Sequence, residues 1–133
     1  MLLLDTNIVS YFIYGADWKN EYVPILRGKT LFIAFMTLAE MLESARHRRL
    51  GERNLCLFKE RLCTEYFIIP WNEEICDRFA WVRSERRNRP ISVPDALIAA
   101  TALAYNLPLV THNARDFTGI DGLKMITCYE ETR

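Results

Sequence analysis

Four acidic residues occupy comparable places in this sequence. They are Asp5, Glu40, Asp95 and Asp116. Three of them follow a short apolar run, and the fourth stands near the start of a long apolar segment. Carboxylate oxygens that act without His or Cys partners suit hard cations such as Mg²⁺ or Mn²⁺. Because such cations activate water and stabilise an oxyanion leaving group, the acids indicate metal-dependent phosphodiester hydrolysis if folding brings them together.

The elements that must position these acids are short apolar runs that alternate with segments of helical period. The runs are Leu2–Leu4, residues 31–35, Phe67–Ile69, Leu109–Val110 and, more weakly, residues 124–126. This alternation predicts an α/β fold, a three-layer α/β/α sandwich with a central parallel sheet of four or five strands. No repeat or linker divides the chain, so we expect a single domain over residues 1–133. Ligands of such folds bind outside the carboxyl ends of the strands, where these acids should meet.

One predicted helix, over residues 93–105, is apolar on nearly all sides. This pattern is typical of a buried helix, and its many alanines allow close approach to the sheet. Asn106 followed by Pro108 should end it. Asp95 lies in its first turn, so the helix can carry this acid to the same edge of the sheet.

The same acids also fit a purely structural role at helix starts. Thr37-x-x-Glu40 and Ser92-x-x-Asp95 match the capping box, Asn113-x-x-Asp116 has a similar shape, and Asp5 could cap the helix that follows it. Each cap would contribute about 1 kcal/mol. A carboxylate that caps a helix still has lone pairs free for a cation, so capping and metal binding are compatible.

Charge and cysteine content exclude little by themselves. Seventeen basic residues balance seventeen acidic ones, but arginines concentrate at residues 46–53 and 83–89. These clusters could contact RNA phosphates or could be solvated helix faces. The candidate RNA-binding residues are Arg46, Arg48, Arg49, Arg83, Arg86 and Arg87. The four cysteines lack zinc-site spacing, and we expect Cys56 and Cys63 to be buried thiols on one helix face.

No apolar run approaches the ~20 residues that a membrane span needs. Leu2–Leu4 is too short for the core of a signal peptide, and Asp5 interrupts it. We therefore expect a cytoplasmic protein without membrane contact. The five glycines are too scattered to form a phosphate-binding loop, which argues against a nucleotide site.

Four segments of the sequence resemble, in order and spacing, the motifs of PIN-domain nucleases. They are residues 3–7 (LLDTN), 37–40 (TLAE), 94–102 (PDALIAATA) and 109–117 (LVTHNARDF). The resemblance extends from Leu2 to about Ile126 and is strongest to the VapC-type toxins of toxin–antitoxin pairs. Ser44 stands where many relatives have glycine, a departure that concerns packing rather than chemistry.

The resemblance implies an endoribonuclease that depends on Mg²⁺ or Mn²⁺. It implies that Asp5, Glu40, Asp95 and Asp116 form the catalytic, metal-binding quartet. It also implies that Thr6, Asn7 and Thr111 hold these carboxylates in place. The alternative is an RNA-binding or scaffolding PIN domain without catalysis, and the retention of all four acids argues against it.

The resemblance further implies a cognate antitoxin and a homodimer as partners. The consecutive apolar residues 11–14 could line such an interface, because one helix face cannot bury all four, or could belong mostly to the core. His112, next to Thr111, is expected to be a partly exposed surface residue rather than a catalytic one.

Overall fold

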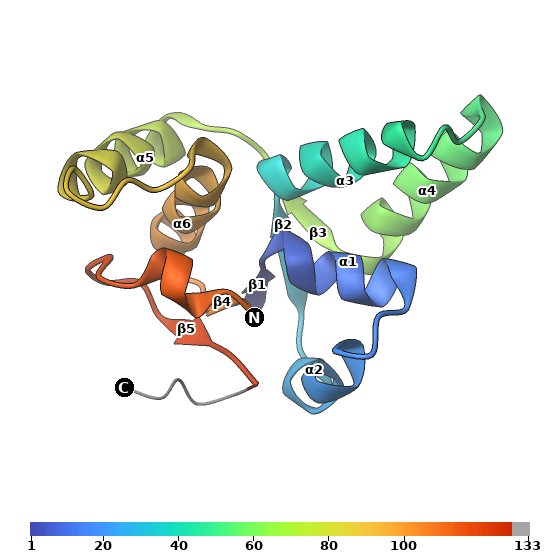
Figure 1. The fold of residues 1–133 in the computed structure, drawn as a ribbon, viewed down its shortest axis with the longest axis horizontal. Helices are drawn as coiled ribbons and strands as arrows, with labels where there is room; N and C mark the ends of the chain where they lie inside the picture. Colours follow the sequence, from blue (N-terminus) through green and yellow to red (C-terminus); the bar gives the residue numbers. More distant parts are fainter. Residues whose placement is uncertain (129–133) are drawn as a thin grey trace.

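A parallel five-stranded sheet organises the computed structural model, which describes residues 1–128 (Figure 1). Its strands are β1 (Leu2–Leu4), β2 (Leu31–Ala34), β3 (Phe67–Ile69), β4 (Leu109–Val110) and β5 (Met125–Ile126). They lie in the order β3-β2-β1-β4-β5, and every neighbouring pair is parallel. The predicted strands are therefore confirmed, apart from shifts of one residue at the end of β2 and at the start of β5.

Six α-helices and one short 3₁₀-helix surround this sheet in the described part of the chain. They are α1 (Thr6–Tyr14), α2 (Lys19–Leu26), α3 (Phe35–His47), α4 (Glu52–Glu65), α5 (Glu73–Glu85), α6 (Val93–Tyr105) and η1 (Ala114–Phe117). Figure 1 shows α5 and α6 together on one side of the sheet and α1, α2 and α4 on the other. The predicted three-layer α/β/α sandwich is confirmed.

Two hydrophobic cores, one on each face of the sheet, hold the layers together. Because side chains of a strand alternate between faces, Leu3 packs with the residues of α5 and α6, whereas Leu2 and Leu4 pack with those of α1, α2 and α4. Helix α3 contributes to both cores: Phe35 and Met36 join the first, and Met41 joins the second. This helix therefore bridges the layers beside the carboxyl end of β2.

Helix α6 is buried along most of its length, as its composition predicts. Residues 96–102 are all inaccessible or nearly so. Ser92 caps its start, and Asn106 ends it in the left-handed conformation, with φ of 51°. This tight packing fixes the direction in which the first turn of α6, with Asp95, approaches the sheet.

At the carboxyl ends of the neighbouring strands β1 and β4, the helices connected to these strands lie on opposite faces of the sheet. After β1 the chain enters α1, on one face, whereas β4 is reached from α6, on the other. Leu4 pairs with both Ile33 of β2 and Val110 of β4. Asp5 follows Leu4 immediately, so it emerges at the crevice where open α/β sheets bind their ligands.

The prediction of buried thiols at Cys56 and Cys63 is wrong, because both side chains are exposed. Helix α4 buries Leu55 and Leu62, which share a face at a spacing of seven residues. Each cysteine follows one of these leucines and is therefore rotated by about 100° toward solvent. No helix within residues 1–128 combines the length and apolar character that crossing a membrane requires.

Candidate active site

Asp5 is the most buried of the four acids, with only 4% of its surface exposed. Both of its carboxylate oxygens accept hydrogen bonds: Oδ1 from the backbone N–H of Thr6 and Oδ2 from the hydroxyl of Thr111, each at 2.8 Å. Asp5 is thus the N-cap of α1, as expected. Burial raises the pKa of Asp5 from 3.8 to about 6, and the nearby carboxylates of Asp95 and Glu40 add to this effect, while the two hydrogen bonds oppose it.

Glu40 lies beside Asp5 because Thr6 contacts both. The Thr6 hydroxyl donates to Glu40 Oε1 at 2.7 Å and lies 3.1 Å from the hydroxyl of Thr37. Burial raises the pKa of Glu40, and the carboxylate of Asp95 adds to the rise. The predicted cap at Thr37 is wrong, since α3 already begins at Phe35; Thr37 is a buried helix residue that supports Thr6.

Asp95 stands in the first turn of α6, where its backbone N–H donates to Ser92 Oγ at 3.2 Å. This contact confirms Ser92 as the helix cap. The side chain is half-buried, and burial raises its pKa, with a further contribution from the carboxylate of Asp116. An acid at a helix N-terminus is favoured by the helix dipole, so this position tolerates a negative charge.

Asp116 is the most exposed acid and lies in η1, just beyond β4. Asn113 precedes η1, but its side chain makes no capping hydrogen bond, so the predicted side-chain cap is wrong. Instead, the backbone N–H of Asp116 donates to the Asn113 carbonyl at 2.9 Å.

The four acids are electrostatic neighbours although they come from four separate elements. Asp95 influences the pKa values of Asp5 and Glu40, and Asp116 influences that of Asp95. Among the described residues, however, no three His, Cys, Asp or Glu side chains already form a group that could hold a metal ion. Folding thus brings the four acids into one region, but no three of them are close enough together to hold one metal ion as they stand.

The chemistry of this region nevertheless suits a hard divalent cation. All its potential ligands are oxygens, and three of the four carboxyl groups have raised pKa values. Repulsion between neighbouring carboxylates contributes to these raised pKa values, whereas a cation among them would relieve the repulsion and favour their ionised forms.

The three residues expected to support the acids differ in their placement. Thr6 and Thr111 donate hydrogen bonds to Glu40 and Asp5, as described above, and Thr111 Oγ1 also accepts from the backbone N–H of Asn113 at 3.0 Å. Asn7 lies in the first turn of α1 with an exposed side chain. The two threonines therefore contact the quartet directly.

His112 is partly exposed, as expected, and packs within an aromatic group. Its Nδ1 lies 2.7 Å from the hydroxyl of Tyr22, and its ring centroid lies 4.2 Å from that of Trp18. The rings of His112 and Tyr11, a residue of α1, pack edge to face with their centroids 5.6 Å apart. Burial lowers the pKa of His112. The contacts tie the segment after β4 to α1 and α2.

Arg86 is not an RNA-facing residue, so its predicted role is wrong. Its side chain is buried, with 8% exposure, and its guanidinium donates only to backbone carbonyls, including that of Asp116. The other five candidate arginines are exposed. Arg46 pairs with Glu52 at 3.8 Å, and the Arg48 guanidinium lies 3.8 Å from the centroid of the Tyr14 ring.

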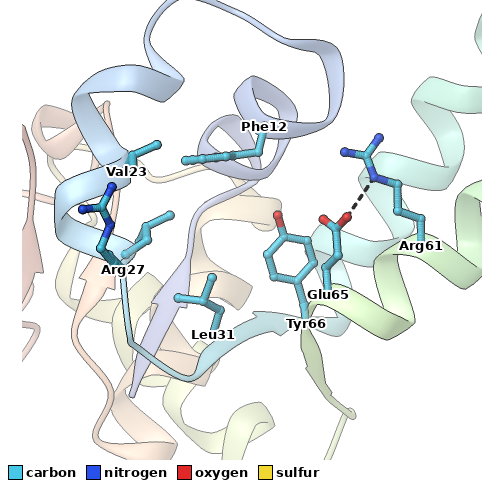
Figure 2. Close-up of a pocket in the computed structure, with 8 residues that line it drawn as sticks. Phe12, Val23, Arg27, Leu31, Arg61, Glu65 and Tyr66 are labelled. Carbon is cyan, nitrogen blue, oxygen red and sulfur yellow. Dashed lines mark hydrogen bonds and ion pairs between the residues drawn. The ribbon is translucent and has the colours of Figure 1, made fainter.

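An open, largely apolar pocket of about 440 Å³ lies at the opposite end of the sheet (Figure 2). It is lined by Phe12, Val23, Leu26, Arg27, Leu31, Arg61, Glu65 and Tyr66. Leu31 begins β2 and Tyr66 directly precedes β3, which places the pocket at the amino ends of the strands. None of the four acids lines it, so it is separate from the candidate active site. Phe12 is the member of the apolar stretch 11–14 that faces it.

Comparison with known proteins identifies relatives along nearly the whole chain. Ribonuclease VapC1 of Haemophilus influenzae (strain R2866) is 30% identical over 129 residues, which cover 92% of this chain and 93% of that protein. The tRNA(fMet)-specific endonuclease VapC of Shigella flexneri is 29% identical over 125 residues, with coverage of 92% and 93%. The solved structure of VapBC-1 from nontypeable Haemophilus influenzae matches with a TM-score of 0.79 and 27% identity, over 96% of this chain and 97% of that one.

A family model described as PIN domain matches residues 2–123, a range that contains all four acids. The order of the strands, the position of the acids beyond them and this match agree with the resemblance found in the sequence motifs. The chain belongs to the PIN domain family.

Proposed function

We propose that this chain is a single-domain endoribonuclease that depends on a divalent cation, Mg²⁺ or Mn²⁺. The observation that carries the proposal is the environment of Asp5: a buried carboxylate held by two hydrogen bonds, beside Glu40 and Asp95, at the carboxyl edge of the sheet. A structural cap has no need of three further acids as neighbours. The names of the relatives, ribonuclease and endonuclease, support the same reaction class.

In this proposal Asp5 and Asp95 would hold the cation, and Asp116 and Glu40 would complete its surroundings. When bound, the cation supplies charge that activates water and stabilises the leaving oxygen of the phosphodiester. Thr111 and the backbone of Thr6 keep both Asp5 oxygens in fixed directions, so little reorganisation is needed on binding. The Thr6 hydroxyl orients Glu40 in the same way.

The substrate in this proposal is RNA, and the biological role is that of the toxin in a VapBC-type toxin–antitoxin pair. Exposed arginines, Arg83 and Arg87 at the end of α5 and Arg46, Arg48 and Arg49 at the end of α3, would contact phosphates. A similar solved structure, a toxin–antitoxin complex from Klebsiella pneumoniae that is 28% identical in sequence, supports an antitoxin as partner. A homodimer located in the cytoplasm completes the proposal.

The test is cleavage of mixed RNA by the purified protein with Mg²⁺ or Mn²⁺ and then with excess chelator. We expect cleavage that stops when the chelator is added. Asp5→Asn should keep the fold but lower the rate at least ~100-fold, a loss of about 2.7 kcal/mol in transition-state stabilisation. The matched control is Asp77→Asn, which removes one exposed carboxylate from α5 and should cleave at the wild-type rate.

The second candidate function is RNA binding or scaffolding without catalysis. It predicts RNA retention in a gel-shift assay with no cleavage under either metal. Cleavage by Asp5→Asn at nearly the wild-type rate, or cleavage that persists with chelator, would reject the metal-dependent scheme.

A further inference from the structure

The guanidinium of Arg86, at the end of α5, is engaged by backbone carbonyls on several sides. Nε donates to the Arg89 carbonyl at 2.8 Å, and Nη1 donates to the Thr118 carbonyl at 3.0 Å. Nη1 and Nη2 share the Asp116 carbonyl at 3.4 and 3.3 Å. One buried side chain therefore joins the α5–α6 connection to the turn that carries an acid of the proposed site.

This arrangement is not an ordinary buried ion pair. The ion pairs of the described residues, Arg46 with Glu52 and Arg61 with Glu65, do not involve Arg86. Burying a guanidinium is unfavourable unless its donors are satisfied, and neutral carbonyls satisfy the donors without neutralising the charge. The planar fork of donors fixes the carbonyls in direction as well as in distance.

The turn that Arg86 holds is short and is anchored in the core by Phe117, which is 1% exposed; the Thr118 hydroxyl also donates to the Ala114 carbonyl at 3.2 Å. Within η1 and its cap, Asp116 N–H donates to the Asn113 carbonyl at 2.9 Å, and Thr118 N–H donates to the Arg115 carbonyl at 3.4 Å. From outside, Arg89 Nη2 also donates to the Arg115 carbonyl at 2.8 Å. Contacts from the α5–α6 connection thus act together with the buried Phe117 to orient a short turn whose acid is exposed.

We propose that Arg86 is a positioning residue, which fixes the backbone of residues 115–118 so that the Asp116 carboxylate faces Asp95. Arg86 touches neither substrate nor cation in this scheme; it acts through Asp116. The inference rests on the proposed function, because it assigns Asp116 to the working site. The same connection leads directly to Ser92 and Asp95 at the start of α6, so one short segment coordinates the placement of two acids.

A double-mutant cycle tests this coupling. Arg86→Gln should lower kcat about 10- to 100-fold with little change in KM, because a displaced carboxylate impairs chemistry more than RNA binding. In the Asp116→Asn background, Arg86→Gln should have no further effect on kcat. Arg86→Lys, which keeps the charge but not the fork, should fall between wild type and Arg86→Gln. Arg78→Gln, which removes an exposed arginine of the same helix, is the matched control and should retain the wild-type kcat.

Two kinetic results would overturn the proposal: a wild-type kcat for Arg86→Gln, or an equal loss in the wild-type and Asp116→Asn backgrounds. If Arg86→Gln fails to fold, Arg86→Lys and Arg89→Gln take its place in the cycle. Amide hydrogen exchange provides a readout that does not depend on activity. Faster exchange at Asp116 and Thr118 in Arg86→Lys, without faster exchange in the β-strands, supports positioning, whereas unchanged exchange rejects it. If the wild-type protein cleaves no RNA, the proposed function fails and exchange alone decides the role of Arg86.

Discussion

The carboxyl group of Asp5 is subject to two opposing effects. Two hydrogen bonds favour its ionised form, while burial and the carboxylates of Asp95 and Glu40 disfavour it. Burial is the largest effect, and the pKa rises to about 6. Between about pH 4 and pH 6 the folded state therefore binds more protons than the unfolded state, so the protein loses stability as pH rises through this window. A pKa displaced from 3.8 to about 6 corresponds to about 3 kcal/mol.

We predict that Asp5→Asn stabilises the metal-free protein at pH 7.5 by up to about 3 kcal/mol, because the amide carries no charge to bury. The gain should shrink toward zero as the pH falls below 3.8, where the wild-type carboxyl group becomes protonated in both states. Urea unfolding at a series of pH values measures the difference. Asp77→Asn, at an exposed position, should show no such trend. A destabilised Asp5→Asn at pH 7.5 would show that its hydrogen bonds outweigh burial.

The sequence identified the acids but not every residue that holds them. Asp5 and Asp95 were found from their positions beside apolar segments, and Thr6 and Thr111 from the motif resemblance. Thr37 and Arg86 were misassigned, because their contacts join residues about 30 positions apart and leave no local pattern. A buried arginine that binds only carbonyls looks, in sequence, like any other member of a basic cluster.

Among the helices, α6 has the longest run of buried residues, Ala96 to Ala102. Ala100 is fully buried, and the helix is enclosed by the sheet, by α5 and by η1. We predict that Ala100→Leu lowers the free energy of unfolding by about 1–3 kcal/mol, since the added atoms must displace close-packed neighbours. Displacement of α6 should also move Asp95 and lower RNA cleavage per folded molecule.

Thermal unfolding and the cleavage rate of the same sample measure both effects. Ala80→Leu makes the same change at an exposed position of α5 and should be nearly neutral in both assays. Loss of stability in Ala100→Leu with an unchanged cleavage rate would show that α6 can shift without moving Asp95.

The positions of helices and strands were easier to predict from the sequence than which side of each helix is buried. The strands and α6 were correct because each is a continuous apolar segment, whose pattern survives an error of one residue. The orientation of α4 was wrong because one residue along a helix turns the side chain by about 100°. Leu55 and Cys56 are both apolar in sequence, yet only the leucine is buried.

At the scale of the whole molecule, the acids form a region of mutual repulsion in a protein whose acidic and basic residues balance overall. We predict that millimolar Mn²⁺ raises the melting temperature at pH 7.5 and that excess chelator reverses the rise, because a cation that binds only the folded state stabilises it. The rise should be smaller at pH 5, where protons compete for Asp5. Differential scanning fluorimetry measures both.

Asp5→Asn should reduce the Mn²⁺-dependent rise, and Asp77→Asn should not. An equal rise in wild type and Asp5→Asn would place the bound ion elsewhere on the molecule. A rise that is larger at pH 5 than at pH 7.5 would contradict competition between protons and metal.

The pairing of β1 with β4 has a consequence for the order in which the protein becomes active during synthesis. Asp5 precedes its partner Thr111 by 106 residues along the chain, and β1 lies between β2 and β4. A nascent chain that has emerged only as far as Glu40 has two of the four acids, Asp5 and Glu40, and cannot yet form the site. Only when the segment from Asp95 to Asp116 has left the exit tunnel can the quartet assemble, so the site stays incomplete while that segment is still inside the ribosome.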